Sequence, residues 1–153
     1  MIGAGGAAEG SETWGLAEEV GRRLAEAGAV VVCGGRGGVM AAVSRGAASA
    51  GGEVIGVVPG IDVGEGNADC TQVVATGVGH ARNLAVVSSG EVVIAIGGEW
   101  GTLSEIGFAR ALGRTVVALR SWGLVGRDQM EGAPGVIPAE TAADAVAAAL
   151  AEL

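Results

Sequence analysis

The sequence predicts an α/β fold of the Rossmann-like type, a doubly wound parallel sheet in a three-layer α/β/α arrangement. Three observations support this prediction. Short apolar runs rich in Val and Ile recur along the chain, and they are nearly continuous, as expected of strands covered on both faces. Amphipathic or Ala-rich segments of helical length separate them. Glycines follow most of these segments, where helices commonly end.

Strands and helices are expected to alternate along the whole chain. The expected strands, in chain order, are residues 1–4, 29–33, 53–58, 72–75, 92–96 and 115–119. The first is short by a few residues, and we expect it to be truncated at its start. The expected helices are residues 11–27, 38–50, 80–89, 102–112 and 138–153. The last helix has Thr141 and Asp144 as a cap pair, and residues 120–135, which show no clear period, are interpreted as a long loop.

Length, charge and cysteine content restrict the class of protein. A chain of 153 residues is most simply one domain, spanning residues 1–153, and it is long enough to bury a core without disulfides. The net charge of −8 argues against binding nucleic acid or an anionic membrane. No apolar run has the length of a membrane span, so we expect a cytoplasmic protein. Cys33 and Cys70 lack metal-ligand spacing, and we expect no metal site.

The loops that follow the strands predict a binding site for a phosphorylated ligand. Right-handed crossovers place residues 3–10, 34–38, 77–83 and 97–105 at one edge of the sheet, where ligands bind in such folds. Three of these loops are rich in glycine, and backbone amides at a helix N-terminus attract anions. Ordinary tight turns also use glycine, so each loop alone is a weak signal.

The first loop suggests NAD binding as a minor alternative. Its sequence, GAGGAAEG, nearly matches the dinucleotide fingerprint G-x-G-x-x-A. That fingerprint also requires an acidic residue at the end of the second strand, and here the strand ends in Val32, Cys33 and Gly34 without one.

The stretch IGGEWGTLSE at residues 96–105 allows two interpretations. Thr102 and Glu105 have the spacing of a capping box, in which each side chain bonds to the other residue's amide. Alternatively, Glu105 faces Arg82, which lies at the start of the preceding helix. If the fourth and fifth strands are neighbours, these two side chains meet above the edge of the sheet. An Arg there suits a phosphate or orients a carboxylate.

Taken together, the motifs resemble the LOG-like proteins. GGRGGVM at residues 34–40, GHARN at residues 79–83 and GGEWGTLSE at residues 97–105 occur in the order seen in that group. It contains cytokinin riboside monophosphate phosphoribohydrolases, proteins often mislabelled lysine decarboxylase, and molybdenum-cofactor carrier proteins. The resemblance spans essentially the whole chain.

This resemblance implies a nucleoside-monophosphate site, with the phosphate on the amides of Gly101 and Thr102. It further implies that Arg82 and Glu105 assist cleavage of the N-glycosidic bond, with no cofactor required. In the hydrolases the last motif reads P-G-G-x-G-T-x-x-E, so Gly97 replaces the proline and Glu99 the second glycine. Where the family has an Arg-Lys pair, this chain has Arg82 and Asn83, so the lysine is replaced. These departures are more similar to the carrier branch, whose members bind a phosphorylated pterin.

Two functional hypotheses therefore stay open. One is a nucleoside 5′-monophosphate phosphoribohydrolase with Arg82 and Glu105 as catalytic residues. The other is a non-catalytic carrier of the molybdenum cofactor or of a nucleotide. For both, the candidate binding residues are Gly34, Gly35, Arg36, Gly37, Gly38, Asn83, Gly97, Gly98, Trp100, Gly101 and Thr102. The resemblance also implies a homo-oligomer, a dimer or a tetramer.

Overall fold

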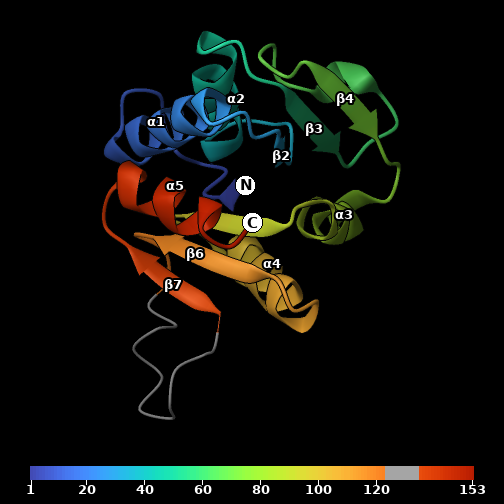
Figure 1. Cartoon of the computed structure of the whole chain (residues 1–153). Helices are drawn as coiled ribbons and strands as arrows, with labels where there is room; N and C mark the ends of the chain where they lie inside the picture. Colours follow the sequence, from blue (N-terminus) through green and yellow to red (C-terminus); the bar gives the residue numbers. More distant parts are fainter. Residues whose placement is uncertain (123–134) are drawn as a thin grey trace.

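A computed structural model describes residues 1–122 and 135–153 and confirms the α/β class (Figure 1). The strands are β1 (Ile2–Gly3), β2 (Val31–Cys33), β3 (Val54–Val58), β4 (Gln72–Ala75), β5 (Val92–Ile96), β6 (Thr115–Leu119) and β7 (Val136–Ala139). The helices are α1 (Glu12–Glu26), α2 (Val39–Ser49), α3 (Arg82–Ser89), α4 (Trp100–Ala111) and α5 (Ala142–Leu150), with short 3-10 turns η1 (Val63–Glu65) and η2 (Gly79–Ala81).

All strand pairs described are parallel, and they form two ladders. One ladder has the order β1-β5-β6-β7 and the other the order β2-β3-β4. The amino group of Met1 joins the two, because it donates a 2.7 Å hydrogen bond to the carbonyl oxygen of Val32 in β2. The strands therefore run β4-β3-β2, then β1, then β5-β6-β7, and the order reverses around β1 as in doubly wound folds.

Helices cover both faces of these strands. One buried cluster joins α1, α2 and α5 to one face and includes Val20, Val43 and Val146. A second cluster joins α3 and α4 to the other face and includes Val87 and Ile106. The strands are thus buried on both sides, which explains why their sequences are apolar runs without alternation.

Helices α1 and α2 cross at two glycines. A Cβ atom on Gly46 would overlap the carbonyl oxygen of Glu18, and one on Gly21 would overlap the carbonyl oxygen of Val43. Neither glycine has a positive φ. Each is needed because the backbones of the two helices pack directly on each other. This close crossing fixes α2, whose N-terminus follows one of the predicted ligand loops.

The end of the chain differs from the prediction. Residues 136–139 form the strand β7, and the helix that follows begins at Ala142 instead of residue 138. Pro138 is tolerated because β7 is an edge strand with one unpaired side. The predicted cap is confirmed, since Thr141 Oγ1 accepts a 3.1 Å hydrogen bond from the amide of Asp144. The predicted loop at residues 120–135 lies mostly outside the described residues.

Within the described residues, the helices lack the combination of length and apolarity that a membrane span requires.

Candidate functional site

The loop of residues 34–38 connects β2 to α2 and packs against the first loop. Gly38 has φ +61°, and a Cβ atom there would overlap the carbonyl oxygens of Ala4 and Gly5. The amide of Val39 donates a 3.0 Å hydrogen bond to the oxygen of Ala4. Only glycine fits position 38, because it needs a positive φ and close backbone contact.

The remaining residues of this loop have different environments. Gly35 has φ +70° and packs on Gly56 of β3, where a Cβ atom would lie 3.0 Å from the Gly56 Cα atom. Arg36 and Gly37 are exposed, and a Cβ atom on Gly37 would meet no atom within 4 Å. The tip of the loop is therefore open to a ligand, and its base is fixed by packing.

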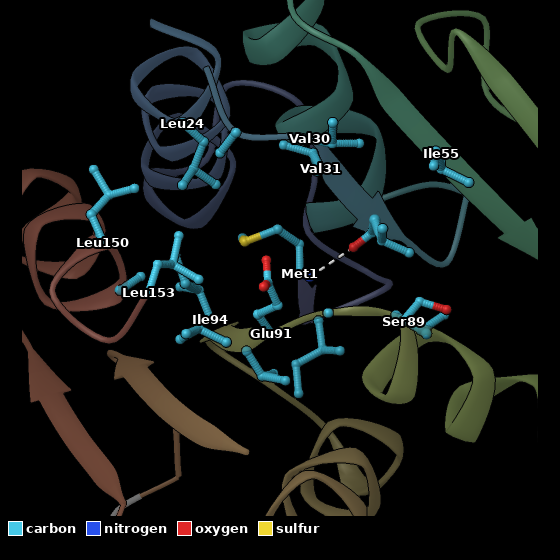
Figure 2. Close-up of a pocket in the computed structure, with 18 of the residues that line it drawn as sticks. Met1, Leu24, Val30, Val31, Ile55, Ser89, Glu91, Ile94, Leu150 and Leu153 are labelled. Carbon is cyan, nitrogen blue, oxygen red and sulfur yellow. Dashed lines mark hydrogen bonds between the residues drawn. The ribbon is translucent and has the colours of Figure 1, made fainter. Parts of the chain in front are cut away.

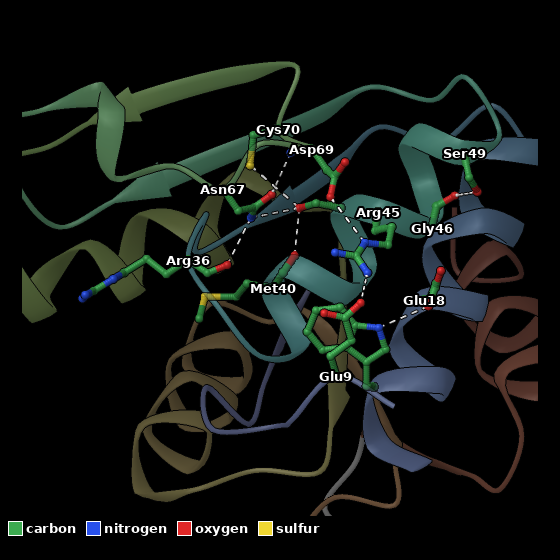
Figure 3. A network of polar contacts seen from close by, with 12 residues as sticks. Glu9, Glu18, Arg36, Met40, Arg45, Gly46, Ser49, Asn67, Asp69 and Cys70 are labelled. Carbon is green, nitrogen blue, oxygen red and sulfur yellow. Dashed lines mark hydrogen bonds and ion pairs between the residues drawn. The ribbon is translucent and has the colours of Figure 1, made fainter. Parts of the chain in front are cut away.

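Asn67 holds the loop in place, a role that no motif in the sequence indicates. The backbone amide of Asn67 donates a 2.7 Å hydrogen bond to the carbonyl oxygen of Gly35. Its side-chain Nδ2 donates a 3.1 Å hydrogen bond to the carbonyl oxygen of Arg36. Asn67 Nδ2 also donates a 3.4 Å hydrogen bond to Ser44 Oγ in α2. Figure 3 shows the Arg36 side chain pointing away from this network. Arg36 is thereby anchored through its backbone and leaves its guanidinium free of this network.

Arg82 is the first residue of α3 and lies against the glycine loop. A Cβ atom on Gly34 would overlap the Nη1 atom of Arg82, so the guanidinium rests on that glycine. The Nε atom of Arg82 is buried and has no hydrogen-bond partner among the described residues. Burial lowers the pKa of Arg82, the charge of Glu105 opposes this effect, and the charge of Arg36 adds to it. The two guanidinium groups are thus close enough to repel each other, and a bound anion would offset this repulsion.

Glu105 lies in the second turn of α4, with 7% of its surface exposed. The predicted capping box is wrong, because α4 begins at Trp100 and its N-cap is Glu99, so Thr102 is inside the helix. Burial raises the pKa of Glu105 to about 7, although the charges of Arg82 and of the chain's amino group oppose this rise. The carboxyl group is therefore turned into the protein near Arg82.

The strands that carry these two residues are not neighbours. β4 and β5 belong to different ladders, so the simple route by which Arg82 and Glu105 were expected to meet is wrong. They approach because α3 runs from the outer strand β4 back beneath β3 and β2 towards α4. Asn83, the next residue of α3, is half-buried beside Arg82.

The N-terminus of α4 presents backbone amides without a side-chain cap. Glu99 makes no capping hydrogen bond, whereas Ser11 caps α1 and Thr141 caps α5. The first amides of a helix have no partner within the helix, so those of residues 100–102 are available to an anion. Gly97 (φ +57°) and Gly98 (φ +140°) form the turn that precedes them.

Two tryptophans stand at this N-terminus. The rings of Trp100 and Trp122 are 5.0 Å apart and inclined by 43°, and Trp122 Nε1 donates a 3.2 Å hydrogen bond to the oxygen of Glu99. Trp100 is 76% exposed, which leaves a large flat surface beside the free amides. The Glu99 carboxylate lies near the first loop, where a Cβ atom on Gly6 would be 3.4 Å from Oε1.

The site thus combines two arginines, a buried carboxyl group, free helix amides and an exposed aromatic ring. Among the described residues, no group of three or more His, Cys, Asp or Glu side chains is placed to hold a metal ion. The arrangement suits a ligand with an anionic group and a flat ring.

Comparisons with known proteins identify the family. A model of the SLOG cluster4 family matches residues 1–146, and the chain belongs to this family. An uncharacterized protein of Archaeoglobus fulgidus is 43% identical over 121 residues, which make up 78% of either chain. The LOG-like resemblance seen in the motifs is confirmed.

Two solved structures are similar along nearly the whole chain. The molybdenum cofactor binding protein of Rippkaea orientalis is 30% identical with a TM-score of 0.88, and the match covers 98% of this chain and 93% of that one. The molybdenum cofactor carrier protein of Chlamydomonas reinhardtii is also 30% identical with a TM-score of 0.88, and the match covers 99% of this chain and 94% of that one.

Proposed function

We propose that this member of the SLOG cluster4 family binds the molybdenum cofactor, a phosphorylated pterin, and carries it without turning it over. Proteins described as binding or carrying this cofactor share the fold at 30% identity over 98% or more of the chain. The carrier hypothesis also accounts for Glu99 and Asn83, which depart from the hydrolase motifs.

The observation that carries this proposal is the unsatisfied guanidinium of Arg82. Its buried Nε atom has no partner among the described residues, and an unsatisfied buried donor costs about 1–3 kcal/mol. A phosphate that reached the guanidinium of Arg82 would accept charge-assisted hydrogen bonds from it, and Arg36 would add a second positive charge. The amides of residues 100–102 would then bind further phosphate oxygens.

The remaining part of the cofactor fits the same region. The exposed ring of Trp100 offers a stacking surface for a pterin, next to the amides that would hold its phosphate. In this assignment the protein binds and orients its cargo, and the molybdenum chemistry belongs to the cargo alone.

Glu105 favours a second function, hydrolysis of a nucleoside 5′-monophosphate. A carboxyl group with a pKa of about 7 exchanges protons near neutral pH, which suits general acid–base work. In its ionised form it would orient water and stabilise positive charge that develops on the ribose. Arg82 would hold the phosphate in this mechanism too.

One assay separates the two functions. The protein is incubated with AMP and a panel of other nucleoside 5′-monophosphates, and free base and ribose 5-phosphate are measured. The carrier proposal predicts no release of base beyond that of Glu105→Gln, while the protein retains the molybdenum cofactor. Turnover that Glu105→Gln abolishes, with ligand binding preserved, would replace the carrier proposal with the hydrolase.

We also propose a homo-oligomer. Phe108 in α4 and Leu112 at its C-cap are exposed one helical turn apart and would form a common apolar face. Light scattering after size-exclusion chromatography tests this. A dimer or tetramer is expected, and Phe108→Glu should shift it towards the monomer; a native protein that is monomeric at micromolar concentration would contradict it.

A further inference from the structure

The two cysteines of the chain meet at the base of the glycine loop of residues 34–38. Cys33 ends β2 and is fully buried, whereas Cys70 precedes β4 and is partly exposed. Both sulfur atoms contact the hydroxyl of Ser44, with Sγ–Oγ distances of 3.7 Å for Cys33 and 3.8 Å for Cys70. The proposed carrier function gives these two thiols no role.

Gly56 of β3 makes room for this thiol pair. Cys33 lies opposite Gly56 in the parallel register, so a side chain at position 56 would stand on the same face, about 4.8 Å from that of Cys33. A Cβ atom on Gly56 would lie 2.7 Å from Cys70 Sγ, so the sulfur of Cys70 fills this place. A disulfide needs Cβ atoms about 3.8 Å apart, and a short movement of Cys70 towards Cys33 achieves this.

The surroundings of the pair favour a thiolate. The adjacent thiol of Cys70 lowers the pKa of Cys33 to about 6, and burial opposes this effect. The amide of Gly35 also stabilises the thiolate, because it donates a 3.4 Å hydrogen bond to Cys33 Sγ. Thiolates are the form of cysteine that peroxides oxidise, and the partly exposed Cys70 leaves the pair open on one side.

We propose that Cys33 and Cys70 are a reversible oxidation site, in which hydrogen peroxide joins the two sulfurs in a disulfide and thereby loosens the glycine loop. The thiolate of the pair breaks the O–O bond of the peroxide, which forms a sulfenic acid and releases hydroxide. The sulfur of the remaining thiol then forms the S–S bond, and the hydroxyl group leaves with the thiol proton as water. The two sulfurs supply the two electrons that reduce the peroxide.

Gly35 connects the thiol pair to the candidate site. Its amide donates to Cys33 Sγ, and its oxygen accepts the 2.7 Å hydrogen bond from the amide of Asn67. Asn67 and Cys70 belong to one turn, because the amide of Cys70 donates a 3.2 Å hydrogen bond to the Asn67 oxygen (Figure 3). A Cys70 drawn towards Cys33 therefore moves Asn67, and a disulfide sulfur is a weaker acceptor than a thiolate. Oxidation thus weakens both hydrogen bonds of Gly35.

The cavity in Figure 2 is a separate feature of the molecule. It has a volume of about 550 Å³, and its lining includes Leu24, Val31, Ile94 and Leu150 and neither cysteine. Residues 92–94 of β5 belong to this lining and serve as an internal control in the exchange experiment below.

The first test asks whether the disulfide forms. The native protein and Cys70→Ser are treated with excess hydrogen peroxide, remaining thiols are alkylated in denaturant, and intact masses are measured. The native chain is expected to lose two hydrogen atoms and take up no alkyl group, and dithiothreitol should restore both thiols. Oxygen addition without a disulfide, or a disulfide only between two chains, would overturn the proposal.

Hydrogen exchange tests the loosening of the loop. The amides of Gly35 and Asn67 are expected to exchange at least about tenfold faster in the oxidised native protein, while residues 92–94 stay unchanged. Cys70→Ser lacks the second thiol and should keep its exchange rate at Asn67 after the same treatment. Equal exchange in the oxidised and reduced native protein would overturn the proposal, as would faster exchange at Asn67 in treated Cys70→Ser.

The consequence for ligand binding rests on the proposed function. After removal of the peroxide, the oxidised protein is expected to bind the molybdenum cofactor about fivefold more weakly than the reduced protein. Equal affinity of the two forms would overturn the link between the thiol pair and the candidate site. A cofactor that binds neither form would instead contradict the proposed function, and the mass and exchange measurements would still decide on the oxidation site.

Discussion

Replacing Glu105 with Gln should change how the stability of the protein depends on pH. The carboxyl group is buried in α4, and its pKa is raised from an ordinary 4.5 to about 7. Between these two values the unfolded chain releases the proton while the folded chain keeps it. Folding stability due to this group is therefore fully present below about pH 4.5 and is lost as the pH rises through about 7.

The magnitude follows from the two pKa values. The difference between 4.5 and about 7, at 1.36 kcal/mol for each pH unit, corresponds to about 3 kcal/mol. Glutamine has nearly the same shape and carries no charge. Relative to the native protein, Glu105→Gln should therefore become more stable by about 3 kcal/mol between about pH 4.5 and about pH 8.

Urea unfolding of both proteins across this range measures the effect, with circular dichroism as the signal. Glu91→Gln, at an exposed position, is the control and should follow the native curve. A constant stability difference between Glu105→Gln and the native protein at every pH would contradict this prediction, because it would mean that the folded protein does not disfavour the charged carboxylate.

Two further substitutions test the glycine contacts. Gly34→Ala should push Arg82 aside and weaken binding of the phosphorylated ligand by about tenfold, measured by calorimetric titration, because the loss of one charge-assisted contact is worth about 1.5 kcal/mol or more. Gly15→Ala, whose Cβ would meet no atom within 4 Å, is the matched control; equal affinities for the two variants would argue against this role of Gly34. Gly46→Ala should lower the free energy of unfolding by about 2–3 kcal/mol, because its Cβ overlaps the Glu18 oxygen in α1. A change below about 0.5 kcal/mol in urea unfolding would show that α1 and α2 can separate freely.

Most of the architecture could be predicted because buried parallel strands leave a strong apolar signal. The strand β7 was missed, since Val136–Ala139 is short and contains a proline that usually argues against a strand. The start of α4 was also missed. The spacing of Thr102 and Glu105 fits a capping box as well as it fits two buried positions in the first two turns of a helix, and only packing decides between them.

The candidate site was predictable where it depends on local sequence and not where it depends on distant contacts. The glycine loops, Arg82 and Glu105 belong to short motifs that the sequence displays directly. Asn67 was not predicted, because its role lies in hydrogen bonds to backbone oxygens of a loop about thirty residues away. Sequence position alone carries no sign of such a contact.

In the proposed function, Arg82 binds the phosphate of a molybdenum-cofactor-type ligand. Titration of the purified protein with the cofactor under anaerobic conditions tests it, using Arg82→Gln and the control Arg22→Gln, which alters a half-buried arginine of α1 far from these loops in the sequence. Arg82→Gln is expected to weaken binding by about tenfold or more, while Arg22→Gln should bind as the native protein does. Equal affinity of the native protein and Arg82→Gln would contradict it.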